Sequence, residues 1–172
     1  MKFDPRIVEF LRCPVTKESV RLQDGWLVTE SNARKYRVSD SGIPLFAEHF
    51  CSTDGKKQQF HYDKISKAYV ENLTYPHTQE YMKYLDSAFL EHVEDISTSN
   101  VAEICCGRGE AFRLLKDRIM RGIGVDVSQS MLEVAAGDLS GQFVFLQGDA
   151  TMLPLKDEIF DCVFMFGGIH HV

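Results

Sequence analysis

Three carboxylates lie at or near the ends of apolar segments in the second half of the chain. Glu103 belongs to the run that starts at Val101, Asp126 ends the next run, and Asp149 follows a third. Carboxylates accept hydrogen bonds from hydroxyl and amino groups, and an acid about twenty residues after a glycine turn suits ribose hydroxyls. The pattern predicts a site for a nucleotide-like ligand.

The segment Val101-Ala-Glu-Ile-Cys-Cys-Gly-Arg-Gly109 combines a buried strand with a glycine turn. Gly107 and Gly109 can take a positive φ or let the backbone approach a ligand closely. A helix expected from Glu110 to about Lys116 would present unpaired N–H groups at its start. A turn with a purely structural role is the alternative, because strand, turn and helix also occur without a nucleotide.

Four apolar segments predict the sheet that positions these acids, at 101–109, 122–128, 143–150 and 159–166. The last of them is nearly all apolar, as expected for a strand that is covered on both faces. Their order predicts an open, parallel α/β sheet. Such sheets bind ligands beyond the carboxyl ends of the strands, at the point where the strand order reverses.

From about Asn100 to Val172 the chain resembles the class I S-adenosylmethionine-dependent methyltransferases. The family's first motif, an acid two residues before a glycine-rich turn, is matched at Glu103 with Cys105, Gly107 and Gly109. The second, third and fourth are matched at 126–132, 148–150 and 153–161. The resemblance implies a Rossmann-like doubly wound parallel sheet with strands one to four, preceded by helices and a small antiparallel β unit.

The resemblance also implies a role for each matched residue. Glu103 would lie near the methionine amino group, and the backbone of 106–109 beside the methionine and ribose. Asp126 would hold the ribose hydroxyls, while Asp149 would accept from the adenine amino group. The expected cofactor-binding set is Glu103, Cys105, Cys106, Gly107, Gly109, Asp126, Val127, Met131, Asp149 and Ala150, with Met152 as an alternative to Met131.

One residue departs from the family, and one excludes its nearest competitor. The family usually has glycine where this chain has Cys105, whose Cβ narrows the allowed backbone conformations and the approach distance. A nicotinamide-binding domain would place its third glycine at Phe112, which is too large for that role. The adjacent Cys105 and Cys106 favour packing over redox or metal chemistry.

Residues 1–50 predict a small antiparallel β unit that follows a short helix at Pro5–Leu11. This unit resembles a zinc-ribbon-like domain that activates, or is fused to, some methyltransferases. Its first knuckle is Cys13-x-x-Thr16 instead of Cys-x-x-Cys, so we expect no metal. A core of Trp26, Tyr36 and Phe46 would stabilise the unit.

Residues 51–99 predict a polar linker at 52–57 and two helices that are broken at Pro76. Tyr62-Asp63 and Tyr69 resemble the aromatic entry helix of quinone-biosynthesis methyltransferases. Two interpretations stay open: a lid over the cofactor, or an amphipathic helix that buries one face on the sheet.

The chain ends just after the fourth expected strand, whereas the family has seven. We expect a C-terminally truncated protein that does not turn over alone. The alternative is a homodimer that covers the apolar edge of 159–166. His170 and His171 follow this strand and are the candidates for a base or substrate contact, with a helix-start role as the alternative.

Composition predicts a cytoplasmic protein. No segment resembles a signal peptide or a membrane span, and the odd cysteine count argues for free thiols. The net charge is −6, and because 1–55 is balanced, the excess lies in 56–172. An acidic sheet domain argues against a nucleic acid partner.

The function predicted from these features is methyl transfer from S-adenosylmethionine to a small-molecule acceptor. Two alternatives remain. One is a non-catalytic module that binds S-adenosylmethionine or another protein. The other is an RNA methyltransferase that uses the ribbon-like unit.

Overall fold

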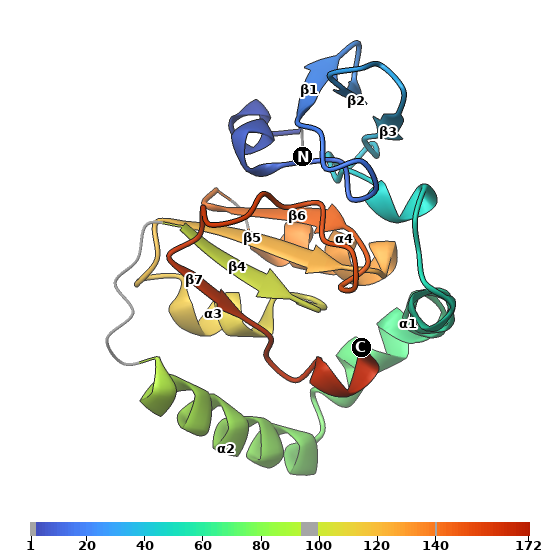
Figure 1. The fold of residues 1–172 in the computed structure, drawn as a ribbon. Coiled ribbons are helices and arrows are strands. Elements are labelled where there is room, and N and C mark those ends of the chain that lie inside the picture. The colour runs from blue at the N-terminus through green and yellow to red at the C-terminus, as the bar shows by residue number, and fades with distance from the viewer. Residues whose placement is uncertain (1–2, 94–99, 140) are drawn as a thin grey trace.

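The computed structural model describes residues 3–93, 100–139 and 141–172, except for the side chain of His171. A small three-stranded sheet lies above a four-stranded sheet, and two long helices run beside and below the latter (Figure 1). The small sheet comprises β1 (Val20–Gln23), β2 (Trp26–Thr29) and β3 (Lys35–Arg37). The long helices are α1 (Thr53–Asn72) and α2 (Pro76–His92).

The larger sheet is parallel, with the order β6-β5-β4-β7. The chain enters at β4, moves outward to β5 and β6, and returns to β7 on the other side of β4. The switch point therefore lies between β4 and β7. This topology confirms the predicted doubly wound α/β fold. The elements are β4 (Asn100–Ile104), α3 (Glu110–Leu115), β5 (Arg121–Asp126), α4 (Gln129–Asp138), β6 (Phe143–Gln147) and β7 (Cys162–Phe164).

The fourth strand is shorter than predicted and is not covered on both faces. β7 begins only at Cys162 and lies at the edge of the sheet, where Val163 is 56% exposed. Ile159 and Phe160, which the sequence placed in this strand, instead pack against the core on one face of the sheet. Their apolar character therefore reflects burial in a loop.

Side chains that alternate along the strands build a separate core on each face of the parallel sheet. Val101 packs with α3 and α4, whereas the next residue, Ala102, packs with the N-terminal unit. Period-two alternation places neighbours on opposite faces. The small β unit and the loop after β6 thus cover the face that α3 and α4 leave open.

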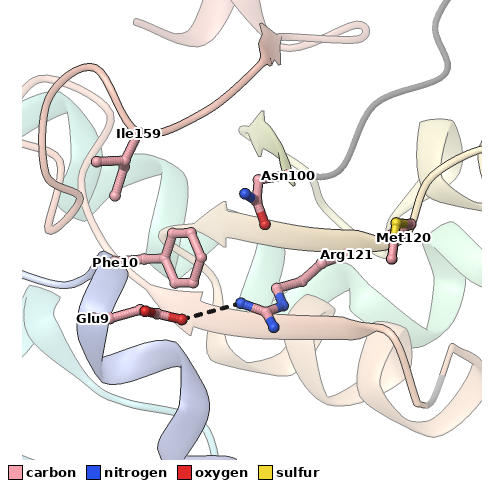
Figure 2. A pocket seen from close by; sticks show the side chains of 6 residues that line it. All are labelled: Glu9, Phe10, Asn100, Met120, Arg121 and Ile159. Atoms are coloured by element: carbon pink, nitrogen blue, oxygen red, sulfur yellow. Dashed lines mark hydrogen bonds and ion pairs between the residues drawn. The ribbon is translucent and has the colours of Figure 1, made fainter.

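A short 3-10 helix, η1 (Pro5–Phe10), docks this unit at the amino ends of β4 and β5. Figure 2 shows the Arg121 side chain reaching toward Glu9 and Phe10: its guanidinium lies 3.3 Å from the Glu9 carboxylate and 5.1 Å from the Phe10 ring centre. The pocket drawn there encloses about 570 Å³. Its two charged residues pair with each other, so it offers little to a ligand.

The core of the small unit differs from the prediction at one residue. Tyr36 and Phe46 are fully buried with ring centres 4.5 Å apart, but Trp26 is 42% exposed. Cys13 is buried beside Tyr36, with 2.8 Å between Sγ and the hydroxyl oxygen. Among the described residues, no group of side chains could hold a metal ion.

The predicted linker at 52–57 is wrong, because these residues start a helix. Ser52 is the N-cap of α1, and its hydroxyl accepts a hydrogen bond from the Gly55 N–H at 3.0 Å. Pro76 occupies the first turn of α2, where its missing N–H is harmless. Neither helix has a fully buried residue. None of the described helices has the length and apolar character needed to cross a membrane.

Candidate functional site

A cavity of about 430 Å³ lies at the carboxyl ends of the parallel strands, between the loops that follow them and α1 and α2. Figure 1 shows α1 beside this edge of the sheet. Many of the predicted residues line it: Cys105, Cys106, Gly107, Asp126, Val127, Met131, Asp149, Ala150 and His170. Glu103 and Gly109 do not line it, and the side chain of His171 lies outside the described residues.

The glycine loop after β4 takes a left-handed conformation at three residues. The φ angles are 55° at Cys105, 52° at Gly107 and 79° at Gly109. The loop is tied down by hydrogen bonds from the Cys106 N–H to the Val125 carbonyl and from the Gly109 N–H to the Cys106 carbonyl. Gly109 precedes α3, and a Cβ there would lie 2.7 Å from Leu139. Its role is close packing.

Cys105 takes the conformation that the family's glycine would adopt freely. A left-handed residue with a Cβ costs about 1–2 kcal/mol. Its side chain fits because Gly168, beyond β7, has none: a Cβ on Gly168 would lie 2.4 Å from that of Cys105. Burial, with Asp126 nearby, raises the pKa of Cys105 to about 12. The thiol is therefore protonated at neutral pH and poorly nucleophilic.

Asp126 ends β5, and its carboxylate organises two loops. One oxygen accepts from the Gly107 N–H and the other from the Ser128 N–H, each at 2.8 Å. Burial raises the pKa of Asp126, although these backbone N–H groups oppose the shift. Each oxygen keeps acceptor capacity, because an ionised carboxylate offers about four lone-pair sites. Asp126 therefore remains able to bind hydroxyl groups.

Asp149 follows β6 and has a different environment. One oxygen accepts from the Thr151 N–H at 2.8 Å and hydroxyl at 2.6 Å. The other accepts from the Ser52 N–H at 2.8 Å and hydroxyl at 2.7 Å. Burial acts to raise the pKa of Asp149, but hydrogen bonds from Thr151 and Ser52 outweigh it and lower the pKa. The residue is only 4% exposed.

Helix α1 is fixed at a second point, one that sequence reasoning missed. Asp63 accepts from the Ser128 hydroxyl at 2.6 Å and from the Ser130 N–H at 3.1 Å. It therefore binds the first turn of α4 from another helix. Helix α1 also presents Tyr62 and Tyr69 to the cavity. Burial raises the pKa of both phenols, so both stay neutral.

Glu103 is fully buried beneath the glycine loop. Neither carboxylate oxygen has a hydrogen-bond partner among the described residues, although the Ala111 and Phe112 N–H groups face it from α3. Burial, with Glu110 nearby, raises its pKa well above the usual value. In its place Glu110 lines the cavity, paired with Arg108 at 2.6 Å. The sequence analysis did not single out Glu110.

Comparison with known proteins gives matches to methyltransferases. Residues 102–172 match the model of a family described as "Methyltransferase domain". A curated protein from Synechocystis sp., named 2-phytyl-1,4-naphtoquinone methyltransferase, is 36% identical over 78 residues, which cover 41% of this chain and 33% of the relative.

Solved structures share the fold. A Haemonchus contortus phosphoethanolamine N-methyltransferase superposes with a TM-score of 0.55 and 18% identity, covering 65% of this chain and 24% of that protein. The DhpI complex gives 0.52 and 23%, covering 67% and 52%. The cyclase SpnF gives 0.54 and 22%, covering 63% and 48%.

The chain spans about a third of the curated relative and about half or less of these structures. These structural likenesses show the fold alone, because a cyclase shares it with methyltransferases. The sequence match is to a methyltransferase domain family over residues 102–172, which is less than half of the chain.

Proposed function

We propose that this protein binds S-adenosylmethionine in the carboxyl-end cavity and transfers its methyl group to a small-molecule acceptor. The observation that carries the proposal is Asp126, whose two oxygens are held by the Gly107 and Ser128 N–H groups at the cavity wall. This arrangement fixes a carboxylate that still has lone pairs for two vicinal hydroxyl groups. The family match over 102–172 supports it.

The residues present fit such a ligand at one end better than at the other. Asp126 would hold the ribose, with Val127, Met131 and Ala150 as neighbours on the cavity wall. Asp149 would accept from the nucleobase amino group, although four donors already contact it. The nearness of Glu103 to the methionine amino group stays a prediction, because Glu103 does not line the cavity.

The acceptor that the cavity suits is an apolar, ring-containing small molecule. One part of the lining is aromatic and aliphatic, comprising Tyr62, Tyr69, Tyr81, Met82, Leu85 and Phe166, although the Arg108–Glu110 pair also lines the cavity. Aromatic walls bury planar ligands and exclude water. The relative from Synechocystis is named for a naphthoquinone, which agrees with such a lining.

The chemistry that this chain contributes is positioning and proton removal. S-adenosylmethionine, when bound, supplies an electrophilic methyl group on a sulfonium. The aromatic wall would orient the acceptor and keep water out, which is the main requirement of an in-line displacement. His170 lines the cavity beyond β7 and would take the proton from an acceptor hydroxyl.

Isothermal titration with S-adenosylhomocysteine tests the binding step. We expect saturable binding to the 172-residue chain and a loss of at least tenfold in the Asp126→Ala variant, because a charged hydrogen-bond partner is removed. Asp117→Ala is the matched control, since Asp117 is an exposed acid outside the cavity. Equal affinity in all three proteins would contradict the proposal.

Methyl transfer is then measured with labelled S-adenosylmethionine and reduced naphthoquinones. Labelled product that needs His170 supports the small-molecule enzyme. Binding without transfer to any acceptor favours the non-catalytic module, and transfer to RNA favours the RNA methyltransferase.

A further inference from the structure

The first turn of α1 occupies the hydrogen-bonding capacity of Asp149. Ser52 contributes two donors to one oxygen, at 2.8 and 2.7 Å, and Thr151 contributes two to the other, at 2.8 and 2.6 Å. A carboxylate accepts about four hydrogen bonds. Asp149 is also 4% exposed. A further donor from a ligand can therefore reach it only if one of the present donors leaves.

The contact with α1 depends on a residue without a side chain. A Cβ on Gly55 would lie 2.3 Å from the Asp149 carboxylate and 2.9 Å from the Ser52 hydroxyl. Glycine in a helix costs about 1 kcal/mol relative to alanine. Two residues of the sequence thus allow the close approach of α1 to Asp149: Ser52 supplies the donors, and Gly55 has no side chain that would clash.

The other anchor of α1 is independent of Asp149. Asp63 binds Ser128 and Ser130 at the start of α4, next to Asp126. It lies about three turns along the helix from Ser52, because a turn takes 3.6 residues. The amino end of α1 can therefore move away from Asp149 while the Asp63 contact persists.

We propose that the first turn of α1 is a strap that closes on Asp149 through Ser52. The amino group of an adenine nucleoside takes the place of Ser52 on Asp149, and the strap opens at its amino end. This inference rests on the proposed function. Because only the open form binds, the apparent affinity is reduced by the fraction of molecules that are open.

Calorimetry with two ligands tests the exchange. Ser52→Ala removes one donor and the N-cap, so we expect S-adenosylhomocysteine to bind about fivefold more tightly than to the unchanged protein. Gly55→Ala blocks closure and should give an equal or larger gain. Lys57→Ala, an exposed change in the same turn, is the control and should leave affinity unchanged.

The second ligand is the purine analogue of S-adenosylhomocysteine, which carries a hydrogen where adenine carries the amino group. Its base has no N–H donor and so cannot replace Ser52 on Asp149, and Ser52→Ala should change its affinity less than about twofold. Hydrogen exchange adds a readout apart from affinity. In the unchanged protein the Ser52 amide should exchange faster once S-adenosylhomocysteine is added.

The outcomes separate the strap from the function beneath it. Weaker or unchanged binding of S-adenosylhomocysteine to both Ser52→Ala and Gly55→Ala overturns the strap alone, since Ser52 would then hold Asp149 in a ligand-competent position. No binding of either ligand to any variant overturns the proposed function and the strap together.

Discussion

Asp126 and Asp149 close neighbouring parallel strands, yet their environments shift their pKa values in opposite directions. Asp126 receives one backbone N–H on each oxygen, and burial raises its pKa. Asp149 receives four donors, and they lower its pKa against the effect of burial. The same residue type at the same edge of one sheet is thus open to a ligand in one case and saturated in the other.

The difference comes from the source of the donors. Those of Asp126 belong to the two loops that flank it, at Gly107 and Ser128. Half of those of Asp149 come from Ser52, 97 residues earlier in the chain. The donors of Asp126 thus come from loops of the parallel sheet itself, whereas Asp149 relies in part on a helix outside the sheet.

The largest expected effect is on stability. Asp149→Ala should lower the free energy of unfolding by about 3–5 kcal/mol and Asp126→Ala by about 2 kcal/mol, because charged hydrogen bonds contribute about 1.5–3 kcal/mol and overlap when they share an acceptor. Urea titration measures both. If Asp126→Ala lowers the free energy of unfolding more than Asp149→Ala does, the number of hydrogen-bond donors does not govern the stability contributed by these acids.

The pH dependence should separate the two acids next. The lowered pKa of Asp149 stabilises the fold above its unfolded pKa, near 3.8, and this stabilisation is lost as the pH falls through the folded value. The raised pKa of Asp126 acts in the opposite sense: stability is lost as the pH rises from about 3.8 through the folded value.

Urea titrations from pH 3 to 8 check this prediction in the Asp149→Asn and Asp126→Asn variants. Asp149→Asn should flatten the dependence of the free energy of unfolding on pH below about pH 4. Asp126→Asn should flatten it above about pH 4. Each slope should change by up to ~1.4 kcal/mol per pH unit. Because Asp126 also helps to raise the pKa of Glu103, part of the flattening in Asp126→Asn comes from Glu103. Identical slopes in both variants would remove the electrostatic contrast.

The smallest effect concerns the loop that supplies Gly107 to Asp126. Cys105 has a φ of 55°, so Cys105→Gly relieves strain while it adds freedom to the unfolded chain, and the net change should stay within about 1 kcal/mol. Cys106→Gly is the matched control. The Cys106 thiol is also buried, but the residue does not have a positive φ. We therefore expect Cys106→Gly to lower the free energy of unfolding by about 2 kcal/mol. Thermal unfolding compares them, and equal losses would show that Cys105 is not strained.

Local pattern was enough to predict the parallel strands and one end of the site. Apolar segments that end in acids gave β4, β5 and β6, and the glycine turn after β4 was placed correctly. The same reasoning turned 52–57 into a linker, because Ser52, Asp54 and Gly55 are typical of turns. In the structure these residues cap and begin α1. The Ser52 hydroxyl accepts a hydrogen bond from the Gly55 N–H, and the Ser52 N–H donates one to Asp149.

Trp26 and Glu103 show the same limit. The sequence analysis placed Trp26 in a core with Tyr36 and Phe46, but Trp26 is 42% exposed, whereas the other two rings are buried together. Glu103 stands in the position of the family's acid, yet its side chain lies beneath α3 and not in the cavity wall. The environment of a strand residue depends on which segment covers its face of the sheet, and those segments come from distant parts of the chain.

The sequence by itself determined where the strands lie along the chain, the glycine turn and the identity of the acids, because these follow from side-chain periodicity and backbone freedom over a few residues. Only the tertiary structure decided which of these acids faces a cavity, which is saturated and which is buried without partners. Those properties depend on donors and burial supplied across 97 residues in the case of Asp149 and Ser52. No local pattern records them.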